Sequence, residues 1–188
     1  MKLGKIKKEI KKYGNMTYAA DNDGFVWIGV RGLGEYRMNG IKDITPENIL
    51  RMIGFDEKEA ETISIYDDED LTEDDRKRRF MDISELDKPA SLLCKIDTGD
   101  TALVLITENE IDGCVLIPDT GYKILDDDES IEMYIRGRRA VFKNGMLLRA
   151  VIEPVYLWGD GLKSYKAQIS KLNRMVQKIR DESEDQEN

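Results

Sequence analysis

The first thirteen residues carry an apolar stripe with helical spacing. Its members are Leu3, Ile6, Ile10 and Tyr13. Intervals of three and four residues place them on one face of an α-helix, and lysines occupy most of the positions between them. Gly14 follows the last apolar residue, where helices commonly end. The pattern predicts an amphipathic helix at the start of the chain.

Runs of β-forming residues follow, with turn sequences between them. Three such turns are Asp23-Gly24, the segment DTGD at 97–100, and Asn144-Gly145. An Asn-Gly or Asp-Gly pair between two β-rich runs is a strong short-range signal for a hairpin. We therefore predict three hairpins and a mainly antiparallel sheet, which the run at 114–117 extends.

Two further helices are predicted from their start signals. Thr45 suits an N-cap, Pro46 suits the first turn, and Gly54 suits the end of a middle helix. The acidic residues 126–129 would be stabilised at the positive end of a helix. We therefore also expect a short helix from this point to Tyr134.

The last helical pattern is the longest. Apolar residues follow heptad spacing at Leu162, Tyr165, Ile169, Leu172, Val176 and Ile179, and bases flank them. We expect this helix to dock on the protein's own sheet, because fewer than three heptads rarely sustain a free coiled coil. Pairing with a second copy and contact of the basic face with a nucleic acid stay open as alternatives.

Together these elements predict an α+β fold. It has a mainly antiparallel sheet with hairpins, an N-terminal helix, a middle helix and a long C-terminal amphipathic helix. An acidic and then basic segment, 56–79, is predicted to connect an N-terminal part, 1–55, with a β-rich part that includes the C-terminal helix, 80–180. Residues 181–188 form an acidic tail.

Composition and charge limit the function. The chain has 188 residues, of which 40% are hydrophobic and 36% are charged, which suits one folded domain, or one with a small appendage, inside a solvated shell. The formal net charge is −9. Phosphates repel such a protein as a whole, so it would bind DNA only through a local basic face. A basic protein partner fits the charge better.

Missing residue types exclude some chemistry. There is no histidine, and the two cysteines, Cys94 and Cys114, lie in apolar runs. This set cannot make a four-ligand zinc site and suggests two reduced, buried thiols. No apolar run approaches the length of a membrane span. No apolar segment follows the lysine-rich start, so we do not expect it to be a signal peptide. We expect a cytoplasmic protein with no cofactor, no metal and no enzymatic activity.

Three segments resemble known functional motifs but do not match them fully. Gly29, Gly32 and Gly34 resemble a phosphate-binding loop, but Arg37 stands where a dinucleotide fingerprint needs glycine. We interpret them as a turn-rich β segment. The sequence DNDG at 21–24 lacks the further acids of a calcium loop. Pro46-Glu47 with Asp56-x-Lys58 has nuclease-like spacing, but it indicates the start of a helix.

Two acidic clusters are the main candidates for a partner-binding surface. The first is Asp67, Asp68, Glu69 and Asp70, and the second is Asp126, Asp127 and Asp128 with Glu129. Closely spaced carboxylates imitate the charge line of a nucleic acid and could occupy the basic channel of a nuclease or repressor. A solvated connector or helix cap, and a weak cation site, are the alternatives.

Three stretches resemble a known group of proteins. They are GFVWIGVRGLGEYRMNG, ITPENILRMIGFDEK and GRRAVFKNGMLLRAVIEP, in this order. The order resembles small proteins from prophages and mobile elements of Firmicutes, a neighbourhood associated with type II-A anti-CRISPR proteins. The resemblance implies an inhibitor of an RNA-guided DNA nuclease and transfers no functional residue.

We therefore expect a non-catalytic binding protein of a mobile element that inhibits a host nucleic-acid-binding effector. The first alternative is a DNA-binding accessory protein that uses the basic face of the C-terminal helix, at Lys166, Lys171, Arg174 and Lys178. The second alternative is a metal-dependent hydrolase that uses the acidic clusters. The sequence does not define an oligomeric state.

Overall fold

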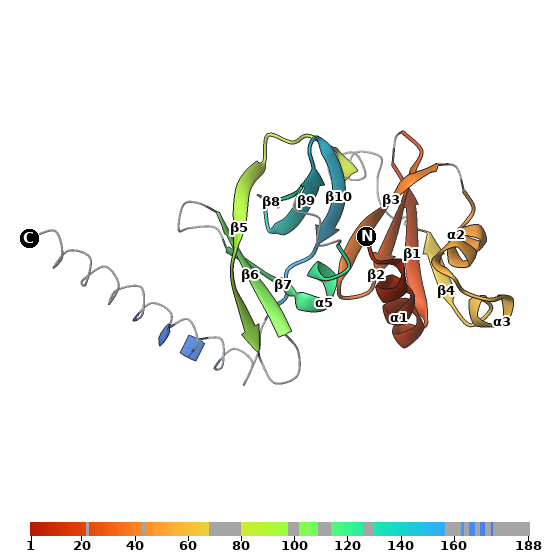
Figure 1. The fold of residues 1–188 in the computed structure, drawn as a ribbon, viewed down its shortest axis with the longest axis horizontal. Helices are drawn as coiled ribbons and strands as arrows, with labels where there is room; N and C mark the ends of the chain where they lie inside the picture. The colour runs from red at the N-terminus through yellow and green to blue at the C-terminus, as the bar shows by residue number, and fades with distance from the viewer. Residues whose placement is uncertain are drawn as a thin grey trace, which may run out of the picture.

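The computed structural model describes residues 1–21, 23–42, 44–67, 80–97, 102–108, 114–125 and 130–156, with single positions at 163, 166, 167, 170, 171 and 174. Within these residues the chain forms one ten-stranded sheet with short helices (Figure 1). The strand order is β4-β1-β2-β3-β10-β9-β8-β5-β6-β7.

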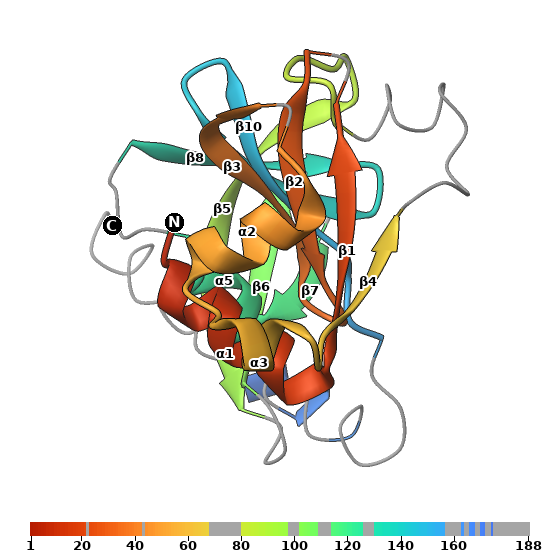
Figure 2. The same cartoon turned by 90° about the vertical axis from the view of Figure 1, so that its right-hand side faces the viewer.

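The first half of the chain contributes four strands and the larger helices. Its elements are α1 (Leu3–Tyr13), β1 (Asn15–Ala20), β2 (Phe25–Val30), β3 (Gly34–Lys42), α2 (Pro46–Ile53), α3 (Glu57–Ala60) and β4 (Ser64–Asp67). β1, β2 and β3 are antiparallel neighbours, whereas β4 returns beside β1 in the parallel direction. Figure 2 shows α1, α2 and α3 in front of these strands.

The second half of the chain continues the sheet. Its elements are β5 (Asp87–Asp97), β6 (Ala102–Glu108), β7 (Cys114–Pro118), α5 (Asp119–Tyr122), β8 (Ile131–Arg136), β9 (Arg139–Asn144) and β10 (Leu147–Ile152). β10 pairs with β3 and so joins the two halves. After β10, the Val155 amide donates to the Leu116 carbonyl of β7 at 2.7 Å, so this half of the sheet curves back toward its own end.

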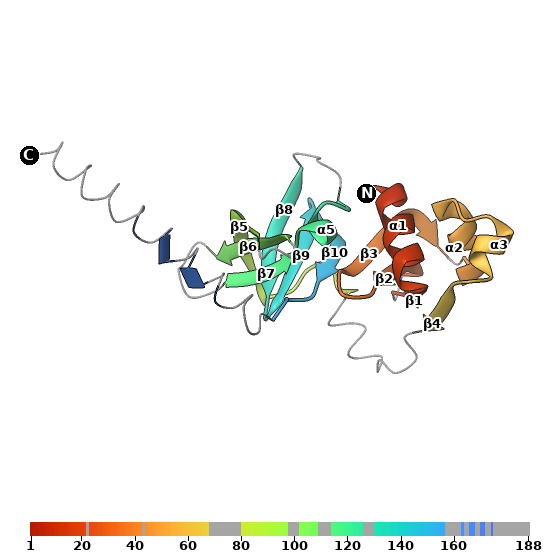
Figure 3. The ribbon, with the colours of Figure 1, turned by 90° about the horizontal axis from the view of Figure 1, so that it is seen from below.

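The larger core lies on one face of the sheet. Ile6 and Ile10 of α1 and Leu50 of α2 are almost fully buried there, together with Tyr36 and Phe142 from the strands. The Tyr36 hydroxyl donates to the Gly121 carbonyl at 3.1 Å and ties α5 to β3. Figure 3 shows the three N-terminal helices gathered at one end and strands β5–β9 toward the other.

A smaller core lies on the opposite face. It contains Trp27, Phe80, Val141 and Leu148, and the rings of Trp27 and Phe80 stack with centroids 4.5 Å apart. Phe80 belongs to the segment that leads into β5. The segment before β5 therefore covers part of this face, which is the face that holds the candidate site.

Several local patterns match the structure. The N-terminal helix ends at Gly14 in the left-handed region, and α2 begins at Pro46 and ends at Gly54 with φ 99°. The three turn sequences join antiparallel neighbours in β1–β2, β5–β6 and β9–β10. The segment predicted as the acidic connector, 56–79, holds α3 and β4 at its start.

The predicted fold class is wrong as a whole. The structure is dominated by one large mixed sheet with short helices, and a long C-terminal helix is not among the elements of its described part. Lys163, Lys166, Lys171 and Arg174 have helical backbone and are exposed. The apolar stripe that was predicted to dock on the sheet, Leu162, Tyr165, Ile169, Leu172, Val176 and Ile179, lies outside the described residues. The sheet buries its faces instead with α1, α2, the 80–86 segment and its own curvature.

The short helix predicted from 126 to Tyr134 is also wrong. Residues Ile131–Arg136 form β8, which pairs with β9 on one side and β5 on the other. Its β-branched and aromatic residues favour this central position in a ladder, and pairing on both sides outweighs the local acidic start signal. In the described ranges, no helix is long and apolar enough to cross a membrane.

Candidate binding site

A row of Cα partners crosses four strands at one end of the sheet. Tyr66 of β4 lies opposite Thr17 of β1, Thr17 lies opposite Gly29 of β2, and Gly29 lies opposite Glu35 of β3. Directly paired residues point their side chains to the same face. Gly29 has no side chain, and the Thr17 side chain lies over it. We call the open space above this part of the row the gap.

At each glycine of this region a larger residue would clash with a neighbour or strain the backbone. A Cβ on Gly29 would lie 1.8 Å from Thr17 Oγ1, and a Cβ on Gly34 would lie 2.6 Å from the Val151 carbonyl oxygen. Gly32 has φ 71° in the β2–β3 turn, a backbone conformation that favours glycine. The glycine motif that the sequence presents is therefore needed for close strand packing and for a tight turn.

A pocket of about 480 Å³ opens over this gap. Its walls are the β2–β3 turn and the side chains of Asn15, Thr17, Glu35, Tyr66, Glu153 and Pro154. This volume falls within the range of small-ligand sites, roughly 300–1,000 Å³. The pocket brings together β1, β2, β3, β4 and the residues after β10, which are distant in sequence.

Two carboxylates and two bases set the charge in and around the pocket. Glu35 is only 7% exposed, and Glu153 accepts a hydrogen bond from Arg139 Nε at 2.6 Å. Arg31 is the one base among the described lining residues and is exposed on the turn. Tyr66 presents a ring that is 57% exposed. The site therefore offers an acidic wall opposite an aromatic wall.

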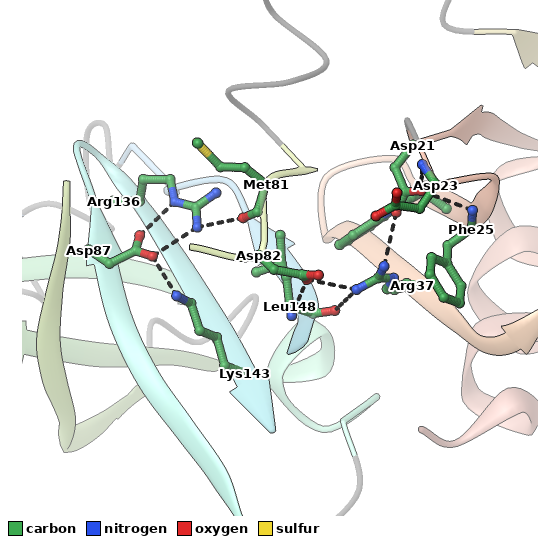
Figure 4. A network of polar contacts seen from close by, with 11 residues as sticks. Asp21, Asp23, Phe25, Arg37, Met81, Asp82, Asp87, Arg136, Lys143 and Leu148 are labelled. Carbon is green, nitrogen blue, oxygen red and sulfur yellow. Dashed lines mark hydrogen bonds and ion pairs between the residues drawn. The ribbon is translucent and has the colours of Figure 1, made fainter. Parts of the chain in front are cut away.

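An ion-pair network occupies the same face beside the pocket (Figure 4). Arg37 is buried between Asp82, at 2.7 Å, and Asp21, at 3.2 Å, and its guanidinium lies 4.0 Å from the centroid of the Phe25 ring. Asp21 also accepts from Trp27 Nε1, and Asp82 accepts from the Leu148 amide at 2.7 Å. These contacts fasten the segment after Phe80 to β3 and β10.

A second ion-pair group lies farther along that segment. Asp87 accepts from Arg136 Nε and from Lys143 Nζ, both at 2.6 Å, and Arg136 also donates to the Met81 carbonyl (Figure 4). Burial alone would raise the pKa of Asp87, but the hydrogen bonds from Arg136 and Lys143 outweigh it and hold the pKa below its usual value. The group is a structural clamp, since its members satisfy one another.

Two more charged groups serve the fold. On the surface of α1, Lys11 and Lys7 donate to Glu59, which lowers the pKa of Glu59 to about 2. Asp119 of α5 is buried, which alone would raise its pKa, yet ion pairs with Lys123 and Lys95 bring the pKa below its usual value. These lysines have carboxylate partners within the chain, so they are weak candidates for nucleic-acid contacts.

The structure places few of the site residues that the sequence suggested. Asp67 ends β4, but its side chain and the rest of both acidic clusters, Asp68–Asp70 and Asp126–Asp128, lie outside the described residues, as does Lys178. Lys166, Lys171 and Arg174 are exposed.

Sequence reasoning missed the pocket residues Glu35, Tyr66 and Glu153. The available signal was the glycine motif at 29–34, which marks a place where strands approach closely. In the sequence that motif indicates only a turn-rich strand segment, and it does not identify the residues of β4 and those after β10 that complete the walls.

Other chemistry finds little support in the described ranges. No group of three or more His, Cys, Asp or Glu residues there could hold a metal ion. Cys94 is a free thiol on β5, and burial raises its pKa. No family model, no curated protein and no solved structure matches the chain. The described residues define an open pocket on a mixed sheet, with Glu35 and Tyr66 in its walls, as the candidate binding site.

Proposed function

We propose that this chain is a non-catalytic binding protein of a mobile element, which acts in the cytoplasm and inhibits a host nucleic-acid-binding effector such as an RNA-guided DNA nuclease. The resemblance of its three sequence stretches supports the mobile-element origin. Its net charge of −9 favours a basic partner, because complementary charge steers association.

One observation carries this proposal: Tyr66 of β4, which lines the pocket, directly precedes the acidic cluster in the sequence. Glu35 and Glu153 line the same pocket, beside Tyr66. Asp67 follows Tyr66 directly and opens the acidic cluster at 67–70. A partner with a basic channel would meet the β4 edge of the sheet first, and its bound nucleic acid would be displaced.

The test uses two variants that remove the same charge. The first carries Asp67→Asn, Asp68→Asn, Glu69→Gln and Asp70→Asn. The matched control carries Glu47→Gln, Glu57→Gln, Glu85→Gln and Glu132→Gln, which are exposed acids elsewhere. Partners that co-purify from bacterial lysate are identified by mass spectrometry, and their affinity is measured at two salt concentrations.

We expect the affinity of the unchanged protein for its partner to fall steeply as the salt concentration rises. The first variant should associate with the partner more slowly. The control should keep most of its affinity, because none of its acids belongs to the cluster at 67–70. Equal affinity of both variants at low salt would exclude the acidic cluster as the binding surface.

A second candidate function has an observation of its own. Lys163, Lys166, Lys171 and Arg174 are exposed with helical backbone, at spacings of three, five and three residues. A basic helical surface of this kind could contact DNA phosphates. Replacing Lys166, Lys171, Arg174 and Lys178 with glutamine should then abolish a salt-sensitive DNA mobility shift, and no shift with the unchanged protein would exclude this function.

A further inference from the structure

We infer that the pocket over Gly29 is a receptor for one arginine side chain of the basic protein partner. This inference rests on the proposed function for the identity of the partner, but its chemistry rests on the pocket. It adds a specific anchor to an interaction that would otherwise depend on long-range charge.

The buried carboxylate of the pocket favours a cation. Glu35, Glu153 and Arg31 are the charged residues among the described lining residues. Glu153 is already paired with Arg139 at 2.6 Å, so the buried Glu35 is the carboxylate that recognises the ligand. An anion such as phosphate would meet both carboxylates at close range. A buried carboxylate such as Glu35 favours a cationic partner, because desolvation strengthens the attraction.

Glu35 has a contact within the chain already, and this contact is compatible with a ligand. An ionised carboxylate has about four lone-pair sites and can accept several donors at once. Asn15 adds capacity, because its Nδ2 donates to the Tyr13 carbonyl and its side-chain oxygen is the complementary acceptor. Thr17 adds a hydroxyl to the same wall.

The walls favour arginine over lysine. Tyr66 lies across the gap from Glu35 in the row Tyr66–Thr17–Gly29–Glu35. A planar guanidinium can stack flat on an aromatic ring and still donate two parallel hydrogen bonds in its own plane to a carboxylate. An ammonium group has no plane to stack and no such pair of donors. A volume of about 480 Å³ has room for this side chain and part of the backbone that carries it.

The protein already uses this arrangement once on the same face. Arg37 lies two residues from Glu35 on β3, stacks on the Phe25 ring at 4.0 Å and pairs with Asp21 and Asp82. The neighbouring row offers an aromatic ring and carboxylates around a gap. An arginine from a partner would fill this gap as Arg37 fills its own position.

The experiment titrates the isotope-labelled full chain with N-acetyl-arginine N-methylamide, and with the lysine and glutamate derivatives. Amide signals of Gly29, Gly32 and Gly34 are followed by NMR. We expect saturable shifts with arginine, weaker binding of lysine and no shift with glutamate. No saturable shift with arginine, or tighter binding of glutamate, would overturn the inference.

Variants localise the effect. Glu35→Gln should weaken arginine binding by about tenfold or more, because a charge-assisted hydrogen bond is lost. Tyr66→Ala should weaken it by about two- to fivefold, and this residue is exposed enough to replace without loss of the fold. Glu85→Gln and Tyr156→Ala, both exposed and outside the pocket, are the matched controls. Unchanged affinity in both pocket variants would place the arginine elsewhere and sink the inference.

The same variants separate this inference from the proposed function. If the acidic-cluster variant loses its partner but the unchanged protein ignores arginine, the pocket inference fails alone. If arginine binds at the pocket but Glu35→Gln leaves the affinity for the basic partner intact, the pocket is not its anchor, and the inference fails while the proposed function stands. If arginine binds and no basic partner is found, the proposed function fails and the pocket's preference for arginine stands.

Discussion

Two adjacent rows of paired residues on one face of the sheet differ in packing: one is filled by side chains, and a pocket opens over the other. In the row Ala19–Trp27–Arg37, large side chains fill the space, and the 80–86 segment seals it. In the row Thr17–Gly29–Glu35, glycine takes the place of tryptophan and a pocket opens. Both rows contain charged residues on β3, at Arg37 and Glu35. The volume of the β2 side chain therefore decides whether this surface becomes core or site.

The largest expected effect comes from emptying the filled row. Trp27→Ala removes a buried ring that stacks on Phe80 at 4.5 Å and a donor to Asp21. We expect a loss of about 3–5 kcal/mol in the free energy of unfolding, measured by urea unfolding. Tyr156→Ala, at an exposed position, should change it little. A loss below about 1 kcal/mol would show that this row is not packed as core.

The second prediction concerns the buried clamp beyond the filled row. Asp87→Asn keeps the shape but leaves Arg136 and Lys143 without their carboxylate. We expect a loss of roughly 3 kcal/mol near neutral pH, since breaking a buried pair leaves uncompensated charge.

The loss in the free energy of unfolding caused by Asp87→Asn should become smaller as the pH falls. The folded pKa of Asp87 is lowered, so its contribution is complete above the unfolded value and is lost as pH falls through the folded value. The difference between the unchanged protein and Asp87→Asn should therefore shrink in acid. A difference that stays constant from pH 6 to pH 3 in urea unfolding would contradict a role for this carboxylate.

Adding a methyl group at Gly29, in the row with the pocket, should cost less than emptying the filled row. A Cβ on Gly29 would lie 1.8 Å from Thr17 Oγ1 and 3.2 Å from Thr17 Cβ, so Gly29→Ala should destabilise the fold by about 1–3 kcal/mol. Adding Thr17→Ala removes the closest atom and should restore part of the loss. A double-mutant cycle in urea measures this coupling, and strictly additive losses would show that the close approach is absent.

The sequence predicts the local parts of this comparison and misses the rest for a physical reason. Asp23-Gly24 and Asn144-Gly145 determine hairpins because turn geometry is encoded in adjacent residues. The pairings β1–β4 and β3–β10 join distant segments, and no adjacent residues encode them. The pocket depends on both pairings, since Tyr66 comes from β4 and Glu153 follows β10. Gly29 was visible in the sequence, but its neighbours in space were not.

The C-terminal prediction failed for a related reason. A heptad stripe shows that a helix has an apolar face, but it does not show what that face covers. In the structure, the sheet is covered by α1, α2 and the segment after Phe80. The range Ile131–Arg136 shows the same limit, because its acidic start signal was weaker than pairing with β5 and β9.

The smallest expected effect on stability comes from an exposed ion pair, which can be compared with a buried ion pair of the same separation. Arg139 Nε and Glu153 Oε1 are 2.6 Å apart, the same separation as Arg136 Nε and Asp87 Oδ1. The first pair is 42% and 45% exposed, and the second is 6% and 4% exposed. Water and salt screen the exposed pair, so Glu153→Gln should change the free energy of unfolding by less than about 1 kcal/mol. If urea unfolding gave Glu153→Gln and Asp87→Asn equal losses, separation rather than burial would set the strength of these pairs. Because Glu153 also lines the pocket, a nearly neutral effect on stability makes Glu153→Gln a clean probe of binding, whereas Asp87→Asn would alter the fold itself.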